Sequence, residues 1–189
     1  MTPRGRLWSP PLWLGFLWGV AEGTLFFIVP DIILSWASLS SARNGLRTLC
    51  ATVAGSLVAG VLMYGWASWR PESSRAVVAS VPFVTPSMFE RVRADYLKHG
   101  AAGMLKGPGS GIPYKVYAVL APPVCPLATF VVMSIPARIE RLALSWLSFT
   151  ILGRIFANWL TKHPRGATLL FAVFWIVIYA FYWARICAT

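Results

Sequence analysis

Long apolar stretches that end beside arginine or lysine constrain this chain more than any other feature of its sequence. Hydrophobic residues make up 57% of its 189 residues and charged residues 12%, about half of the charged share usual in soluble domains. A soluble domain of this length could not bury so much apolar surface. The sequence therefore predicts an all-α integral membrane protein. It excludes a disordered chain and an ordinary cytosolic enzyme.

The strong positive charge of the chain, formally +11, has an explanation in the membrane. In a soluble protein such a charge would indicate a nucleic-acid partner. Here the basic residues flank the apolar stretches, where arginine and lysine contact anionic lipid headgroups. We therefore expect membrane lipids as partners and no nucleic acid.

The sequence lacks the motifs of common catalytic and metal sites. Cys50, Cys125 and Cys187 lie in or beside apolar runs, and no Cys/His metal-binding spacing occurs. GxSxG, HExxH and P-loop patterns do not occur either. We expect a protein that is not an enzyme and that uses no metal or cofactor.

The first apolar run, residues 12–39, is interrupted by Glu22, Pro30 and Asp31. One membrane span needs only about 20 residues. A straight helix would place a proline and two carboxylates in lipid, whereas a broken segment is tolerated beside protein or a water-filled cavity. We expect the helix to break after residue 29 and a short re-entrant arm to follow.

The second broken segment, residues 101–137, contains the glycine-rich sequence Lys106-Gly-Pro-Gly-Ser-Gly-Ile-Pro-Tyr-Lys115. Two short apolar arms then surround a proline-rich tip at 122–126, and Pro136 ends the second arm. Arms of about ten residues cannot cross a bilayer as helices, so we expect a second re-entrant hairpin. Short segments interrupted by glycine and proline at matching places in two halves are typical of a transporter site.

These patterns predict one membrane domain over residues 1–189 with two pseudo-symmetric halves. Ala51, Gly55 and Ala59 share one helix face and predict close packing against another helix. Residues 88–99 predict an amphipathic helix at the membrane surface. The expected segments are a first half over 11–69 with a turn at 43–45 and a full span over 46–69, a polar connection over 70–100, a second half over 101–162 with a span over 142–160, and a C-terminal transmembrane helix over 166–187.

Glu22 and Asp31 are candidate proton-coupling residues. An ionised carboxylate is costly to bury in hydrocarbon, so each acid is protonated, faces a cavity or pairs with a base. A carboxylate poised between burial and a nearby cation can load and release a proton. The alternatives are a structural ion pair and, for Asp31, the N-cap of a short helix.

Lys106, Lys115 and Arg138 are the matching cations. A glycine-rich loop exposes backbone N–H groups that can cradle an anion, and lysine and arginine supply charge for a phosphate. The alternative is that the loop is only a hairpin turn. The residues expected in the two re-entrant loops are Pro30, Gly107, Pro108, Gly109, Gly111 and Pro113.

The remaining charges have simpler interpretations. Glu140 and Arg141 are expected to be interface charges. Arg154 lies within a span, where it either faces the cavity or reaches the interface along its own stem. His99 and His163 lie in polar borders, and we expect them to be solvated.

The order of these motifs resembles the DedA family, also called the VTT or SNARE-associated Golgi protein family, over roughly residues 15–160. Glu22 and Pro30-Asp31, followed by an apolar arm and a span rich in glycine and alanine, resemble the first half of that family. Lys106 to Lys115 and the sequence ending at Arg138 resemble its second half. The family usually has arginine where Lys106 stands, and lysine lacks the bidentate geometry of arginine.

The resemblance implies a multi-pass bacterial inner-membrane protein with two facing re-entrant hairpins. It implies proton-coupled movement of a lipid phosphate, undecaprenyl phosphate in bacteria, by a single chain or a homo-oligomer. Glu22 and Asp31 would handle protons, and Lys106, Lys115 and Arg138 would hold the lipid phosphate. The alternatives are a small-ion or solute transporter, a membrane enzyme acting on a lipid headgroup, and a membrane-assembly protein that transports nothing.

Overall fold

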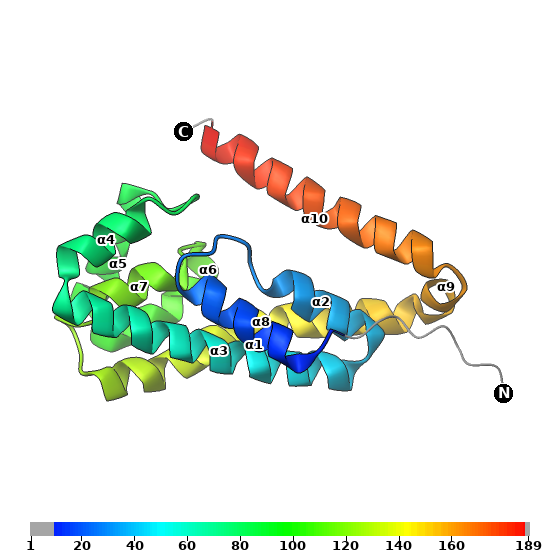
Figure 1. The fold of residues 1–189 in the computed structure, drawn as a ribbon, viewed down its shortest axis with the longest axis horizontal. Coiled ribbons are helices and arrows are strands. Elements are labelled where there is room, and N and C mark those ends of the chain that lie inside the picture. Colours follow the sequence, from blue (N-terminus) through cyan, green and yellow to red (C-terminus); the bar gives the residue numbers. More distant parts are fainter. Residues whose placement is uncertain (1–9, 188–189) are drawn as a thin grey trace.

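The structure is a computed structural model that describes residues 10–187, and every regular element in that range is helical (Figure 1). The all-α prediction is therefore confirmed for the described residues. The elements are α1 (Leu12–Gly23), α2 (Asp31–Ser40), α3 (Ala42–Trp69), α4 (Pro71–Ala79), α5 (Pro86–His99), the 3-10 helix η1 (Gly100–Lys106), α6 (Gly107–Ser110), α7 (Tyr114–Leu120), α8 (Leu127–Ile155), α9 (Ala157–Lys162) and α10 (Pro164–Cys187).

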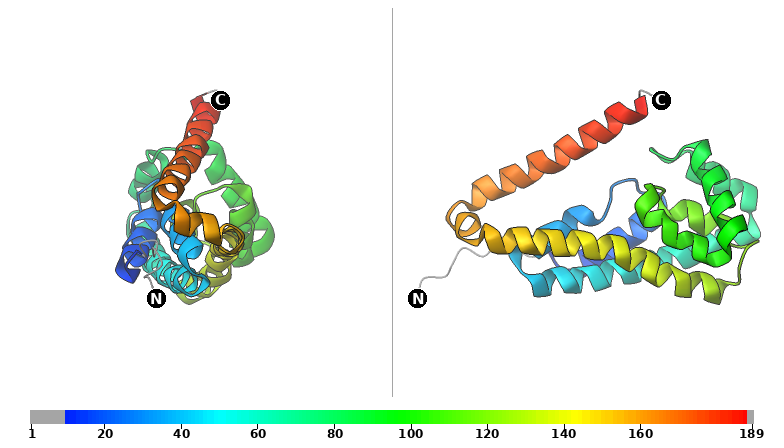
Figure 2. Two further views of the ribbon diagram at one scale, coloured as in Figure 1. Left: turned by 90° about the vertical axis from the view of Figure 1, so that its right-hand side faces the viewer. Right: turned by 180° about the vertical axis from the view of Figure 1, so that it is seen from behind.

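The long helices α3 and α8 lie side by side and carry the shorter elements (Figure 1). Helices α1 and α2 pack on them along one half, and α4 to α7 gather at the other end. The chain reverses at α9, and helix α10 then runs back across the molecule. The C-terminal end of α10 is splayed away from the body (Figure 2). Two helices of the described residues, α3 and α10, are long and apolar enough to cross a membrane.

Close packing of α1 on α3 follows from small residues on both helices. A Cβ atom on Gly55 would overlap the backbone carbonyl of Phe16, and one on Gly23 would lie 2.5 Å from the Cβ of Ala59. The predicted close approach at Gly55 and Ala59 is confirmed, and the partner is α1. Gly19 of α1 meets the α3 backbone in the same way, so α1 contributes a glycine face of its own.

The first break and the first turn differ from the expected ones. Helix α1 ends at Gly23 instead of residue 29, and the Thr24 hydroxyl then donates to the carbonyls of Val20 and Ala21. A side chain that bonds the last turn in this way competes with continuation of the helix. Residues 43–45, expected to form a turn, belong to α3, because the extended backbone of Ser41 alone reverses the chain after α2.

The second half contains one long helix where a short arm and a separate span were expected. Helix α8 runs for 29 residues through Pro136, so the expected second arm and the expected start of a span near residue 142 are wrong. Pro136 lies on the exposed face, and contacts with α2 and α3 on the other face hold the helix together across it. Phe156 then separates α8 from α9, inside the segment expected as a span over 142–160.

The amphipathic helix of the connection is present as α5, but its apolar face points inward. Phe89, Val92 and Tyr96 are buried in the main hydrophobic core, against α7. The Tyr96 hydroxyl donates to the carbonyl of Tyr117 over 2.9 Å, and burial raises the pKa of Tyr96, so this donor keeps its proton. The apolar face of α5 is therefore used by the protein itself instead of by a membrane surface.

Candidate functional site

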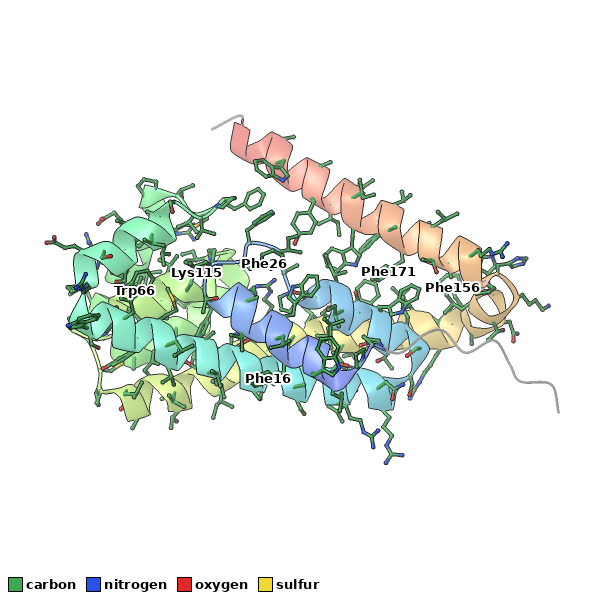
Figure 3. All side chains as sticks on the ribbon, viewed as in Figure 1. Phe16, Phe26, Trp66, Lys115, Phe156 and Phe171 are labelled. Atoms are coloured by element: carbon green, nitrogen blue, oxygen red, sulfur yellow. The ribbon has the colours of Figure 1, made fainter. Side chains whose placement is uncertain are left out.

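The two broken segments meet at the centre of the molecule. The loop over residues 24–30 joins α1 to α2, and residues 111–113 join α6 to α7. The Lys115 ammonium of α7 donates a hydrogen bond of 2.7 Å to the carbonyl oxygen of Phe26 in the first loop. Figure 3 shows these two labelled side chains in the same region, near the end of α1. Segments far apart in the sequence are thus tied together by one lysine.

The first loop is also held from two other helices. The Trp18 indole N–H of α1 donates to the carbonyl of Ile28 over 3.0 Å. The backbone N–H of Val29 donates to the Tyr179 hydroxyl of α10 over 2.8 Å. These bonds satisfy polar backbone groups that leave the helical ladder at the break, which an apolar environment requires.

Two of the buried charges form an ion pair. Arg138 Nη2 lies 2.6 Å from Glu22 Oε2, and each side chain is 5% exposed. The same nitrogen donates to the Ser56 hydroxyl over 3.0 Å, and the guanidinium lies 5.1 Å from the centre of the Tyr114 ring. A buried pair needs such additional partners, because Coulomb attraction alone does not offset the loss of hydration.

A second ion pair lies beside the first. Arg141 Nη2 lies 2.9 Å from Asp31 Oδ2, at the first residue of α2. Residues three apart share one helix face, so Arg138 and Arg141 both face the first loop from α8. The two pairs hold the residues on both sides of that loop, Glu22 before it and Asp31 after it.

These charges line a cavity of about 390 Å³. Its charged lining consists of Glu22, Asp31, Lys115, Arg138 and Arg141, three cations and two acids, so the formal charge is +1. The rest of the lining is largely apolar and aromatic, and it includes residues of the first loop, of the loop between α4 and α5, of α7 and of α10. One cavity therefore combines charged and apolar lining.

Not every residue expected at the site lies there. Lys106 is half-exposed and lies outside the cavity, with its ammonium 3.5 Å from Asp95 Oδ1 and 2.8 Å from His99 Nε2. His99, expected to be solvated, is exposed but contacts this lysine. Lys106 is the last residue of η1, and α6 and the loop over residues 111–113 separate it from Lys115. The two lysines therefore do not share one site.

Only some of the glycines and prolines expected in the re-entrant loops line the cavity. Gly107, Gly111 and Pro113 line the cavity. Gly111 has φ 72°, a left-handed conformation that favours glycine, so this residue permits the sharp turn into α7. Pro30 and Gly109 lie outside the lining, and the side chain of Pro108 lies outside the described part of the structure.

Sequence reasoning missed three contributors. Arg141 was expected to be an interface charge, and instead it pairs with Asp31 inside the site. Trp175 and Tyr179 of α10 line the cavity, although α10 was expected only as a C-terminal transmembrane helix. Of these three residues, only Arg141 could have been found from the sequence. In a continuous α8 it lies about one helical turn after Arg138, on the same helix face. Arg154 is exposed near the end of α8, away from the cavity.

Among residues 10–187, no three His, Cys, Asp or Glu side chains gather closely enough to hold a metal.

Comparison of the chain with protein-family models, with curated proteins and with solved structures finds no match.

Proposed function

We propose that this chain is a multi-pass protein of the bacterial inner membrane that moves an anionic lipid phosphate across the bilayer. The observation that carries the proposal is the environment of Lys115. Its side chain is 2% exposed, its ammonium donates to a backbone carbonyl, and it takes no part in the ion pairs of the described residues. A buried cation without a carboxylate partner is costly, and a bound anion would offset that cost.

A phosphate monoester suits this cavity in charge and in hydrogen bonding. A phosphate monoester carries about one to two negative charges near neutral pH, and the lining has a formal charge of +1. The Lys115 ammonium can donate to a phosphate oxygen, and the buried Nε of Arg138 has no hydrogen-bond partner among the described residues. The apolar residues of the lining suit the hydrocarbon chain to which a lipid phosphate is attached.

Helix lengths support two re-entrant segments whose tips meet within the bilayer. Helices α1 and α2 have 12 and 10 residues, about 18 and 15 Å at 1.5 Å per residue. Neither spans a hydrocarbon core of about 30 Å, so α1 and α2 enter and leave on one side. Helices α6 and α7 approach from the other side, and Lys115 joins the two tips.

Proton coupling is proposed to act through the buried ion pair. Protonation of Glu22 would remove its charge and release the Arg138 guanidinium, which could then bind a phosphate. Deprotonation would restore the pair and favour release of the lipid. Protonation of Asp31 would release Arg141 in the same way, at the other end of the first loop.

The test is transbilayer movement of a fluorescent polyprenyl phosphate in proteoliposomes, with and without a pH gradient. We expect movement by the wild type, a strong loss in Lys115→Met, and loss of the gradient dependence in Glu22→Gln. Lys98→Met, at an exposed site on α5, is the matched control and should retain wild-type movement. Absence of movement by folded wild-type protein would refute lipid transport. Release of trapped inorganic phosphate instead would indicate a solute transporter.

A further inference from the structure

The apolar lining of the cavity includes a strained residue. Phe83, in the loop between α4 and α5, has φ 71°, a conformation that bulky residues rarely adopt. It is the one residue other than glycine with a positive φ in the described range. Such strain persists only where surrounding contacts hold it, and it gathers at ligand clamps and switches.

The contacts that hold Phe83 connect three separate parts of the chain. Its ring lies 4.7 Å from the Trp183 ring of α10 in an edge-on arrangement. It also lies 5.8 Å from the ring of Phe27 in the first loop. We name Phe27, Phe83 and Trp183 the aromatic gate. The gate thus joins the loop that holds the charged site to the helix that covers the cavity.

Apart from its connection to α9, helix α10 has no extensive backbone packing against the elements of the body in the described range (Figure 2). Its contacts with the body include the Tyr179 hydroxyl bond to Val29 and an aromatic pair between Phe171 and Trp36. Ile178 lines the cavity, while the opposite face of α10 is exposed and apolar. A chain that leaves the cavity beside α10 would therefore pass directly from an apolar wall to the lipid-facing side.

We propose that the loop over residues 80–85 and α10 form the binding site for the apolar tail of the ligand, and that the aromatic gate closes its lateral exit. The occupant is the hydrocarbon chain of the lipid whose phosphate binds at Lys115, because the apolar and charged linings belong to one cavity. The inference rests on the proposed function. It adds the route of the tail and the residues that control it.

The experiment uses phosphatidic acid with a diazirine in one acyl chain, in nanodiscs of phosphatidylcholine that contain the full-length protein. After illumination, mass spectrometry locates the adducts. We expect adducts in residues 80–85 and 175–183 that an excess of unlabelled phosphatidic acid removes. Adducts on the outer face of α8, such as Val132, should resist this competition, because bulk lipid contacts that face.

The Phe83→Gly variant tests the gate. Glycine accepts φ 71° without strain, so the backbone of the loop can keep its conformation while the ring is lost. We expect the competition-sensitive adducts at residues 175–183 to increase several-fold, because the exit is open. Phe83→Leu, which keeps an apolar side chain at the strained position, should lie between the wild type and Phe83→Gly. Unchanged adducts in Phe83→Gly would refute the gate.

Retention of the lipid is measured in parallel by native mass spectrometry. Selective retention of phosphatidic acid over phosphatidylcholine, with competition-sensitive adducts only outside residues 80–85 and 175–183, would overturn the tail site and leave the proposed function intact. No selective retention would overturn the proposed function itself. The two failures are therefore distinguishable.

Discussion

Replacing Glu22 by glutamine should destabilise the protein strongly, because the change leaves a buried guanidinium without its counter-charge. The two side chains are each 5% exposed and lie 2.6 Å apart. Breaking a buried ion pair by removing one partner costs about 3–5 kcal/mol. For a domain of this size each kcal/mol lowers Tm by roughly 2–4 °C, so we expect a loss of about 6 to 20 °C.

The assay is thermal unfolding of purified protein in detergent, with circular dichroism as the readout. Glu90→Gln is the matched control, because it removes the same charge from an exposed pair with Arg93 at 2.9 Å; exposed pairs contribute about 0.2–1 kcal/mol. The double variant Glu22→Gln/Arg138→Met should regain much of the lost Tm, since it removes the guanidinium that Glu22→Gln leaves without a counter-charge. A Tm loss for Glu22→Gln no larger than that of the control would refute the reasoning.

Four further variants test the packing, the continuity of α8 and the second ion pair. Gly55→Ala should lower Tm, with a cost of about 1–3 kcal/mol, because its new methyl group overlaps a carbonyl of α1. Gly65→Ala is the control. A methyl group there meets nothing within 4 Å, so this variant should leave Tm unchanged or raise it. Pro136→Ala should raise Tm in the same assay, because it restores a helical N–H in α8 at an exposed position. Asp31→Asn should lower Tm less than Glu22→Gln does, because the Asp31–Arg141 pair is more exposed; equal losses would contradict the burial argument.

The first broken segment could be predicted from local chemistry. Glu22, Pro30 and Asp31 violate the composition of a straight membrane helix, so the sequence itself marks the break. The limits of α1 were less predictable, since the end at Gly23 depends on the Thr24 hydroxyl and on contacts with α3. The break was visible in the pattern, and its position depended on packing.

The partners of the acids could not be predicted from the sequence. Pro136 locally favours the end of a helix. A helix that ended there would place Arg138 in a different segment from the residues before the proline. In the structure, packing against α2 and α3 overrides this preference. The Tyr179 hydroxyl bonds the backbone of Val29 across 150 positions in the chain, and no local pattern indicates such a contact.

The role of Lys115 in holding the phosphate can be measured by the lipid that the protein retains. Native mass spectrometry would compare phosphatidic acid with diacylglycerol of the same chains, so that only the phosphate differs. We expect the wild type and Lys98→Met to retain phosphatidic acid in preference to diacylglycerol, and Lys115→Met to show no preference. An unchanged preference for phosphatidic acid in Lys115→Met would contradict this role.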